Sequence, residues 1–370
     1  MKSVWRTASI FALVTTVSAF VRLSTVQRRL VALQTTPVFP RLSDNETEAC
    51  DFDDDMTLMS STTDADNSII TQELHSASPL TDYSAGSPLG GTDGQDDLHW
   101  FRFAGVGRLY EDEENTEEVI LARLQRARVA VVGLGGVGSW TAEALSRSGV
   151  GNLVLMDLDD VCISNTNRQL HTLSTNVGSL KTDVMKERLV AINPFANITL
   201  VHDFVMLDNV NEVVGQTFLN DLHVDVVVDA IDGAQEKAAL LAACTKYGLP
   251  VVTTGTTAGK SDPGQIVCRD LVEVQGDTML AACRKKLIQE FDFTDNKKRP
   301  WNIPAVYSTQ GAKLASNADE EEAVASFRSD GNTGSACFVT GSFGFQAAAR
   351  VVEMIVDENL VAPHPNDDDS

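Results

Sequence analysis

The sequence lacks the cysteine pairs that a disulfide framework or a structural zinc site would need. Its six cysteines are scattered singly along 370 residues, and no two of them form a CxxC pair. Structural zinc is usually held by paired Cys or His ligands at close spacing, and disulfide-stabilised domains are small and rich in cysteine. We therefore expect neither a structural zinc ion nor a disulfide scaffold.

Acidic residues are missing from the N-terminal segment. Residues 1–43 contain no Asp or Glu but six Lys or Arg, around an apolar stretch from Ile10 to Val21. That stretch is shorter than the roughly 20 apolar residues of a membrane span. The combination indicates a targeting leader. It resembles the bipartite leader of plastids that are surrounded by extra membranes, and a mitochondrial leader is the alternative.

Basic residues are missing from the segment that follows. Residues 44–97 contain fourteen Asp or Glu and no Lys or Arg, together with many Ser, Thr and Gly. Such a composition offers too little apolar surface to stabilise a fold. We predict a disordered acidic linker over 44–97 and a second disordered segment over 361–370.

The acidic balance of the chain limits how a nucleic acid could bind. The formal net charge is −23 at pH 7, so the surface as a whole repels polyanions. A nucleic-acid substrate would need local basic patches, and the densest are CRKK at 283–286 and NKKR at 296–299. From spacing alone, a solvated helix face or loop explains each of them equally well.

A glycine-rich turn is the first positive signal. In RVAVVGLGGVGSW, Gly133, Gly135 and Gly138 form a GxGxxG pattern between a predicted strand and a helix predicted from Ser139. Such turns bring backbone N–H groups and a helix N-terminus close to a phosphate. The next predicted strand ends at Asp157, where a carboxylate can bind ribose hydroxyls. Taken alone, this unit is typical of an NAD- or FAD-dependent oxidoreductase.

The polar residues after this unit favour phosphate chemistry instead. Asn165, Asn167 and Arg168 could reach a nucleotide phosphate, and Lys181 begins the next predicted helix. Two fixed cations near one phosphate chain suit phosphoryl or nucleotidyl transfer, in which charge builds on oxygen, better than hydride transfer. A surface ion pair is the alternative for either cation alone.

A further predicted strand, VDVVVDAIDG, ends with Asp229 and Asp232. Ligands of open α/β sheets bind at the carboxyl ends of the strands, where a carboxylate can hold Mg²⁺ against a polyphosphate. Capping of the following helix is the alternative role of Asp229. Together these patterns predict an α/β fold with a Rossmann-like, doubly wound, mostly parallel sheet.

As an ordered set, five motifs resemble the ThiF/MoeB/E1-like superfamily of ATP-dependent activating enzymes. They are GLGGVGSW, DLDDVCISNTNRQ, VGSLK, INP and DAID. RFAGVGRLY, VTTGTTAGKSDPGQI and VTGSFGFQAAARVVEMI are similar to the tRNA threonylcarbamoyladenosine dehydratase branch. Relatives that serve ubiquitin-like sulfur carriers usually have the CxxC pairs that are missing here.

The resemblance implies a reaction, cofactors and residue roles. ATP, with Mg²⁺, would adenylate the carboxylate of N6-threonylcarbamoyladenosine at position 37 of tRNA, and cyclisation by the carbamoyl group would expel AMP. Arg108 would act across a homodimer, and it would form the catalytic set with Arg168, Lys181 and Asp232. The nucleotide-binding residues would be Gly133, Gly135, Gly136, Gly138, Asp157, Asn165, Asn167, Arg168, Lys181 and Asp232, of which Asp232 would also bind Mg²⁺.

We expect an ATP-binding domain over 98–270, followed by a substrate lobe with a C-terminal helix over 271–360. Ala305 stands where bacterial relatives are expected to have Cys, which argues against a covalent thiol at that point. Cys283 and Cys337 are candidate replacements, although buried or idle cysteines are the simpler interpretation. The other functions left open are adenylation of a ubiquitin-like or sulfur-carrier protein, a dehydrogenase, and a scaffold without catalysis.

Overall fold

The computed structural model describes residues 94–296, 298–312 and 334–357. The predicted leader, residues 44–93 of the predicted linker and the predicted tail lie outside the described residues. The described part opens with helix α2 at Gly94, so residues 94–97 are helical where the sequence predicted disorder. Within the described ranges, no helix is both long and apolar enough to cross a membrane.

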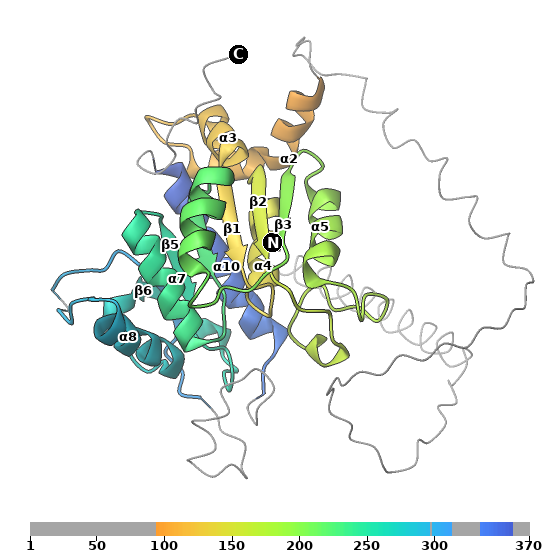
Figure 1. Ribbon diagram of the computed structural model, residues 1–370. Helices are drawn as coiled ribbons and strands as arrows, with labels where there is room; N and C mark the ends of the chain where they lie inside the picture. The colour runs from red at the N-terminus through yellow and green to blue at the C-terminus, as the bar shows by residue number, and fades with distance from the viewer. Residues whose placement is uncertain (1–93, 297, 313–333, 358–370) are drawn as a thin grey trace, which may run out of the picture. The chain divides into compact units, whose positions relative to one another are not determined.

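Strands and helices alternate along the described chain (Figure 1). The elements are α2 (Gly94–Tyr110), α3 (Glu117–Arg126), β1 (Arg128–Val132), α4 (Gly138–Arg147), β2 (Asn152–Met156), η1 (Ile163–Asn165), α5 (Lys181–Ile192), β3 (Asn197–Val201), α6 (Val210–Glu212), the π-helix η2 (Val213–Asp221), β4 (Val226–Asp229), α7 (Ala234–Tyr247), β5 (Val251–Thr254), η3 (Pro263–Gln265), β6 (Ile266–Asp270), η4 (Leu271–Glu273), α8 (Thr278–Glu290), β7 (Pro304–Ser308) and α10 (Cys337–Val356). The strand before the glycine turn and the helix that begins at Lys181 are confirmed.

Seven strands of the described chain form one sheet, in the order β3-β2-β1-β4-β5-β7-β6. Neighbouring strands are parallel except for the pair of β6 and β7. The predicted mostly parallel α/β fold is therefore confirmed. The chain runs outward from β1 to β2 and β3, and then returns to β4 on the other side of β1. This places the topological switch point between β1 and β4, which is where such sheets bind ligands.

Helices cover both faces of the sheet. Successive side chains of a strand point to opposite sides, so apolar residues at successive positions need a covering layer on each face. In β1, Val129 and Val131 join a core formed with α3, α4, α5 and α10, whereas Ala130 and Val132 join a second core with η2, α7 and α8. None of these four side chains is more than 2% exposed. Burial on both faces explains why β1 is an unbroken apolar run in the sequence.

The predicted domain boundary at residue 270 does not separate two lobes. β7 comes after that boundary, yet it lies inside the sheet between β5 and β6. Helix α10 packs against α4 and β5 (Figure 1). The described residues after 270 therefore complete the sheet. The five residues of β7, PAVYS, are too short a run to be distinguished from a loop by pattern alone.

The packing of α4 against β1 depends on Gly138. A Cβ atom at this position would lie 1.8 Å from the carbonyl oxygen of Gly133. We expect Gly138→Ala to lower the free energy of unfolding by more than about 2 kcal/mol, because backbone atoms would have to move. Urea denaturation measures this loss. Gly105→Ala in α2 is the matched control, since nothing lies within 4 Å of its added Cβ, and equal stability of the two variants would contradict our account.

Candidate active site

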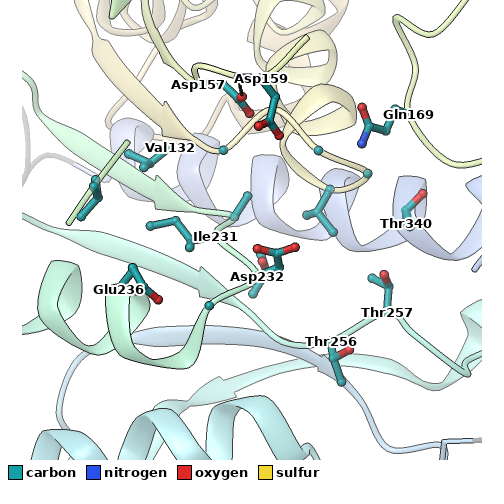
Figure 2. Close-up of a pocket in the computed structure, with 18 of the residues that line it drawn as sticks. Val132, Asp157, Asp159, Gln169, Ile231, Asp232, Glu236, Thr256, Thr257 and Thr340 are labelled. Atoms are coloured by element: carbon teal, nitrogen blue, oxygen red, sulfur yellow. Dashed lines mark hydrogen bonds between the residues drawn. The ribbon is translucent and has the colours of Figure 1, made fainter. Parts of the chain in front are cut away.

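A pocket of about 350 Å³ lies at the carboxyl ends of β1, β2, β4 and β5 (Figure 2). Its volume falls in the range of roughly 300–1,000 Å³ that is typical of small-molecule sites, and it lies at the switch point of the sheet. The sequence-predicted residues that line it are Gly133, Gly135, Gly136, Asp157, Arg168, Lys181 and Asp232. Five stretches that are separate in the sequence thus meet in one cavity.

The glycine turn forms the wall of the pocket at the end of β1. Gly133 has a φ of 87°, and a Cβ atom there would lie 2.9 Å from the carbonyl oxygen of Ala230. The turn therefore requires glycine and brings bare backbone to the cavity. Gly138 is not among the residues that line the pocket, so its contact with a nucleotide stays a prediction without support from the geometry. What the geometry does show is that Gly138 permits the close approach of α4 to the turn.

Asp157 both holds the glycine turn and faces the pocket. Its carboxylate accepts hydrogen bonds from the N–H of Leu134 at 2.6 Å and from the N–H of Asp159 at 2.8 Å. Burial raises the pKa of this carboxyl, and nearby Lys181 and the two N–H groups oppose the rise. Each carboxylate oxygen has a second lone pair. Asp157 can therefore still accept hydrogen bonds from ribose hydroxyls, as the sequence predicts.

Lys181 reaches the pocket from the first residue of α5. The residue is 5% exposed, and its Nζ lies 2.5 Å from Asp159 Oδ2. The Asp159 side chain is 54% exposed, so it balances the buried ammonium from the solvent side. Sequence reasoning missed Asp159, although it lies two residues after Asp157 in the same DLDD run. An incoming phosphate would compete with this carboxylate for the ammonium group.

The segment from η1 onward contributes Arg168 but not the two predicted asparagines. Arg168 is half-buried at the pocket wall, and its guanidinium donates to the Ser164 carbonyl oxygen at 3.1 Å and to Asn167 Oδ1 at 3.2 Å. Asn165 is 8% exposed and turns its amide toward Ser164 Oγ. Asn167 donates to the carbonyl oxygen of Ser335 at 2.8 Å. Both amides thus hold the loop, and the nucleotide contacts predicted for the two asparagines stay predictions.

The two carboxylates at the end of β4 have different surroundings. Asp232 is exposed in the pocket, and in Figure 2 it lies between the glycine-turn side and the opposite wall. Asp229 is fully buried, forms an ion pair with Lys237 at 2.8 Å and accepts a hydrogen bond from Thr253 Oγ1 at 2.6 Å. The N-cap of α7 is Gly233. Asp229 thus neither faces a ligand nor caps the helix.

Binding of magnesium would depend on the carboxylates of the pocket. In the described parts of the chain, no group of three or more His, Cys, Asp or Glu side chains is arranged around a common metal position. Mg²⁺ is commonly bound by one or two carboxylates together with phosphate oxygens and several waters. Asp232, an exposed carboxylate in the pocket, fits that mode of binding.

Comparison with known proteins assigns the family. The model of the ThiF family matches residues 109–366, which is more than half of the chain. The chain belongs to the ThiF family. The tRNA threonylcarbamoyladenosine dehydratases of Haemophilus influenzae and Escherichia coli are both 39% identical to it, over 69% of this chain and 93% of each relative. The crystal structure of the Escherichia coli dehydratase in complex with ATP matches with a TM-score of 0.60 and 38% identity, over 70% of this chain and 95% of that one.

No cysteine lines the pocket of this ThiF-family protein among the residues that the structure describes. Ala305 is fully buried in β7, so a side chain at this position faces the core. Cys283 is also fully buried, and burial raises the pKa of its thiol to about 12. Cys337 is exposed but is not a lining residue. The geometry gives no support to a covalent thiol.

Sequence reasoning missed the loop after β3, which gives the pocket Asp203, Phe204 and Met206. Phe204 is 43% exposed and Met206 is 47% exposed, which is high for large apolar side chains. The strand order could have indicated this loop, because it follows the carboxyl end of β3, the strand next to β2. Without an assignment of β3, the ThiF motifs alone do not point to it.

Arg108 lies outside the pocket of its own chain. It is in the last turn of α2, its side chain is 58% exposed, and its guanidinium pairs with Glu117 at 3.3 Å. The basic segment in α8 is partly engaged as well. Arg284 donates to the carbonyl oxygens of Val272 and Val274, so it contributes less free charge to a polyanion than the sequence suggests.

Proposed function

We propose that this ThiF-family protein is an ATP-dependent tRNA threonylcarbamoyladenosine dehydratase. The observation that carries the proposal is the convergence of the glycine turn, Asp157, Arg168, Lys181 and Asp232 in one pocket. That pocket occurs in a chain that aligns with 93% of the length of two relatives named for this activity. An Escherichia coli relative of that name has been crystallised with ATP and with AMP.

The first step is adenylation of the threonyl carboxylate of N6-threonylcarbamoyladenosine at position 37 of tRNA. A carboxylate oxygen bonds to the α-phosphorus of ATP, and the bond to the leaving pyrophosphate breaks. Asp157 orients the ribose, while Arg168 and Lys181 neutralise the charge that develops on the departing phosphates. Asp232 would hold Mg²⁺, which would supply further positive charge at the phosphate oxygens.

The second step is ring closure without an enzyme nucleophile. The carbamoyl group of the substrate bonds to the acyl carbon, AMP leaves with the electron pair of the C–O bond, and one proton is released. The sum of both steps removes one water from the base. Because attack is intramolecular, the enzyme needs only to orient the mixed anhydride and to exclude water from it, which agrees with a pocket that has no thiol in its described lining.

The proposal includes a homodimer in which Arg108 acts in the pocket of the partner subunit. Its exposed position at the end of α2, away from the pocket of its own chain, supports this role. The leader predicted over 1–43 favours an organelle as the place of action, with a plastid ahead of a mitochondrion. Adenylation of a carrier protein is the less favoured function, since the sequence has no CxxC pair.

The test is to incubate the full chain with ATP, Mg²⁺ and tRNA that carries the threonylcarbamoyl base, and to analyse the digested nucleosides by mass spectrometry. We expect the modified nucleoside to lose one water, with one AMP released for each conversion. ATP binding without that mass change would overturn the proposal. Formation of an acyl-adenylate on a small protein that ends in Gly-Gly would support the carrier-protein alternative instead.

A further inference from the structure

The pocket has a second polar end that the nucleotide-binding residues do not explain. Thr256, Thr257 and Ser335 line it. In Figure 2, Thr256 and Thr257 lie across Asp232 from Asp157. A carboxylate that is to be adenylated must lie beside the nucleotide, in a part of the pocket that the nucleotide leaves empty. This end of the pocket provides such a space.

Segments far apart in the sequence build this wall. Asn167 Nδ2 donates to the carbonyl oxygen of Ser335 at 2.8 Å, which joins the loop after η1 to the start of α10. The N–H of Gly259 donates to the carbonyl oxygen of Gly334 at 2.9 Å, which joins the loop after β5 to the same stretch. The wall is therefore one hydrogen-bonded unit.

Asp277 fixes the loop after β5 in place. It is 1% exposed, and its carboxylate accepts hydrogen bonds from the N–H of Thr256 at 3.0 Å and from the N–H of Leu280 at 2.9 Å. A Cβ atom at Gly255 would lie 2.3 Å from Asp277 Oδ2, so the loop packs directly on this carboxylate. Because the backbone is held this closely, the hydroxyl groups of the loop are preorganised.

Several polar atoms of this wall have no partner in the protein. Ser335 Oγ and Gln169 Oε1 are buried atoms without a hydrogen bond, although both residues line the pocket. Thr257 is half-buried, and its hydroxyl has no hydrogen-bond partner among the described residues. A buried polar atom left unpaired costs roughly 1–3 kcal/mol. Two such buried atoms, beside the unpaired hydroxyl of half-buried Thr257, point to a ligand that completes their hydrogen bonds.

We propose that this wall, formed by Gln169, Thr257 and Ser335, is the subsite for the threonylcarbamoyl group of the substrate. The inference rests on the proposed function. That group is a urea joined to a hydroxy acid, so it offers two N–H donors and a carbonyl acceptor. Gln169 Oε1 accepts an N–H, while the two hydroxyls accept from N–H or donate to the carbonyl oxygen. With the urea held here, the acceptor carboxylate faces the nucleotide end of the pocket.

The experiment measures binding of full-length protein to two tRNAs, one with the threonylcarbamoyl group at position 37 and one with unmodified adenosine there. We expect the wild type to bind the modified tRNA about tenfold or more tightly, a ratio consistent with two or three net hydrogen bonds. In Thr257→Val/Ser335→Ala this preference is expected to fall to about twofold, with ATP affinity unchanged. Ser174→Ala/Thr175→Val is the matched control, since both residues are exposed and neither lines the pocket.

The outcomes separate the subsite from the proposed function. An undiminished preference in Thr257→Val/Ser335→Ala overturns the subsite, as does a wild type that binds both tRNAs equally. An equal loss of ATP affinity in the variant also overturns it, because the residues would then serve the nucleotide or the fold. A wild type that prefers the modified tRNA but makes no dehydrated product would leave the subsite standing and overturn the proposed function.

Discussion

Asp232→Asn is expected to lower the rate of AMP formation by at least about 100-fold, a loss of the size seen when a group that stabilises transition-state charge is removed. Asp232 lies three residues after the end of β4, as an exposed carboxylate in the pocket. It has no hydrogen bond or ion pair within the described residues, so the fold does not depend on its charge. Asparagine keeps the shape of the side chain but removes the anionic oxygen that a hard cation prefers.

The measurement is AMP release with the modified tRNA over a range of Mg²⁺ concentrations, together with the melting temperature. We expect an unchanged melting temperature and a residual rate that excess Mg²⁺ restores only in part. Glu236→Gln is the matched control, because Glu236 lines the same pocket one helical turn further on. Full turnover by Asp232→Asn would remove this residue from the mechanism, and an equal loss in both variants would show that the effect is not specific to Asp232.

The part of the site that could be predicted from the sequence is the part formed by local structure. Residues 128–157 form one β-α-β unit, so the glycine turn and Asp157 are brought together by the chain itself. The loop that carries Thr257 meets the stretch that carries Ser335 through the hydrogen bond from Gly259 to Gly334. This contact depends instead on the return of α10 to the sheet. No pattern in either segment indicates the other.

The direction of individual side chains was a second feature that the sequence could not predict. The motif around Asn165 and Asn167 correctly predicted a segment at the pocket, yet only Arg168 and Gln169 of that stretch face the cavity. A tight turn sends adjacent side chains in different directions, and its local hydrogen bonds decide which of them is used internally. The roles considered for Asp229, ligand binding and helix capping, failed for a related reason. Its partner Lys237 lies in the next helix, α7, and the sequence does not show that the two side chains meet.

Lys237→Met is expected to destabilise the protein strongly and to slow adenylation as well. Lys237 and Asp229 are both fully buried, and their ion pair lies between α7 and the end of β4. Removing one partner of such a pair leaves an uncompensated buried charge, at a cost of about 3–5 kcal/mol. Urea denaturation of the single variant measures this loss.

The same buried pair is connected to the loop that carries Asp232. Asp229 Oδ1 accepts a hydrogen bond from the N–H of Ile231 at 3.2 Å, and Ile231 immediately precedes Asp232. The carbonyl oxygen of Asp229 accepts a hydrogen bond from Thr254 Oγ1 at 3.2 Å. Buried ion pairs contribute little net stability compared with apolar residues of the same volume. We therefore expect the pair to act mainly by positioning the loop that carries Asp232.

The variant Asp229→Leu/Lys237→Met separates the two effects. It removes both charges, so most of the stability lost in Lys237→Met should return. Unlike the single variant, it also removes the acceptor of the Ile231 N–H, so the loop that carries Asp232 loses this hydrogen bond to the end of β4. We expect kcat for AMP formation to stay about tenfold or more below wild type, since small displacements of positioning groups cost rates of this order. A double variant that is stable and fully active would show that the pair serves only the fold, whereas a stable but slow one would assign it to the positioning of Asp232.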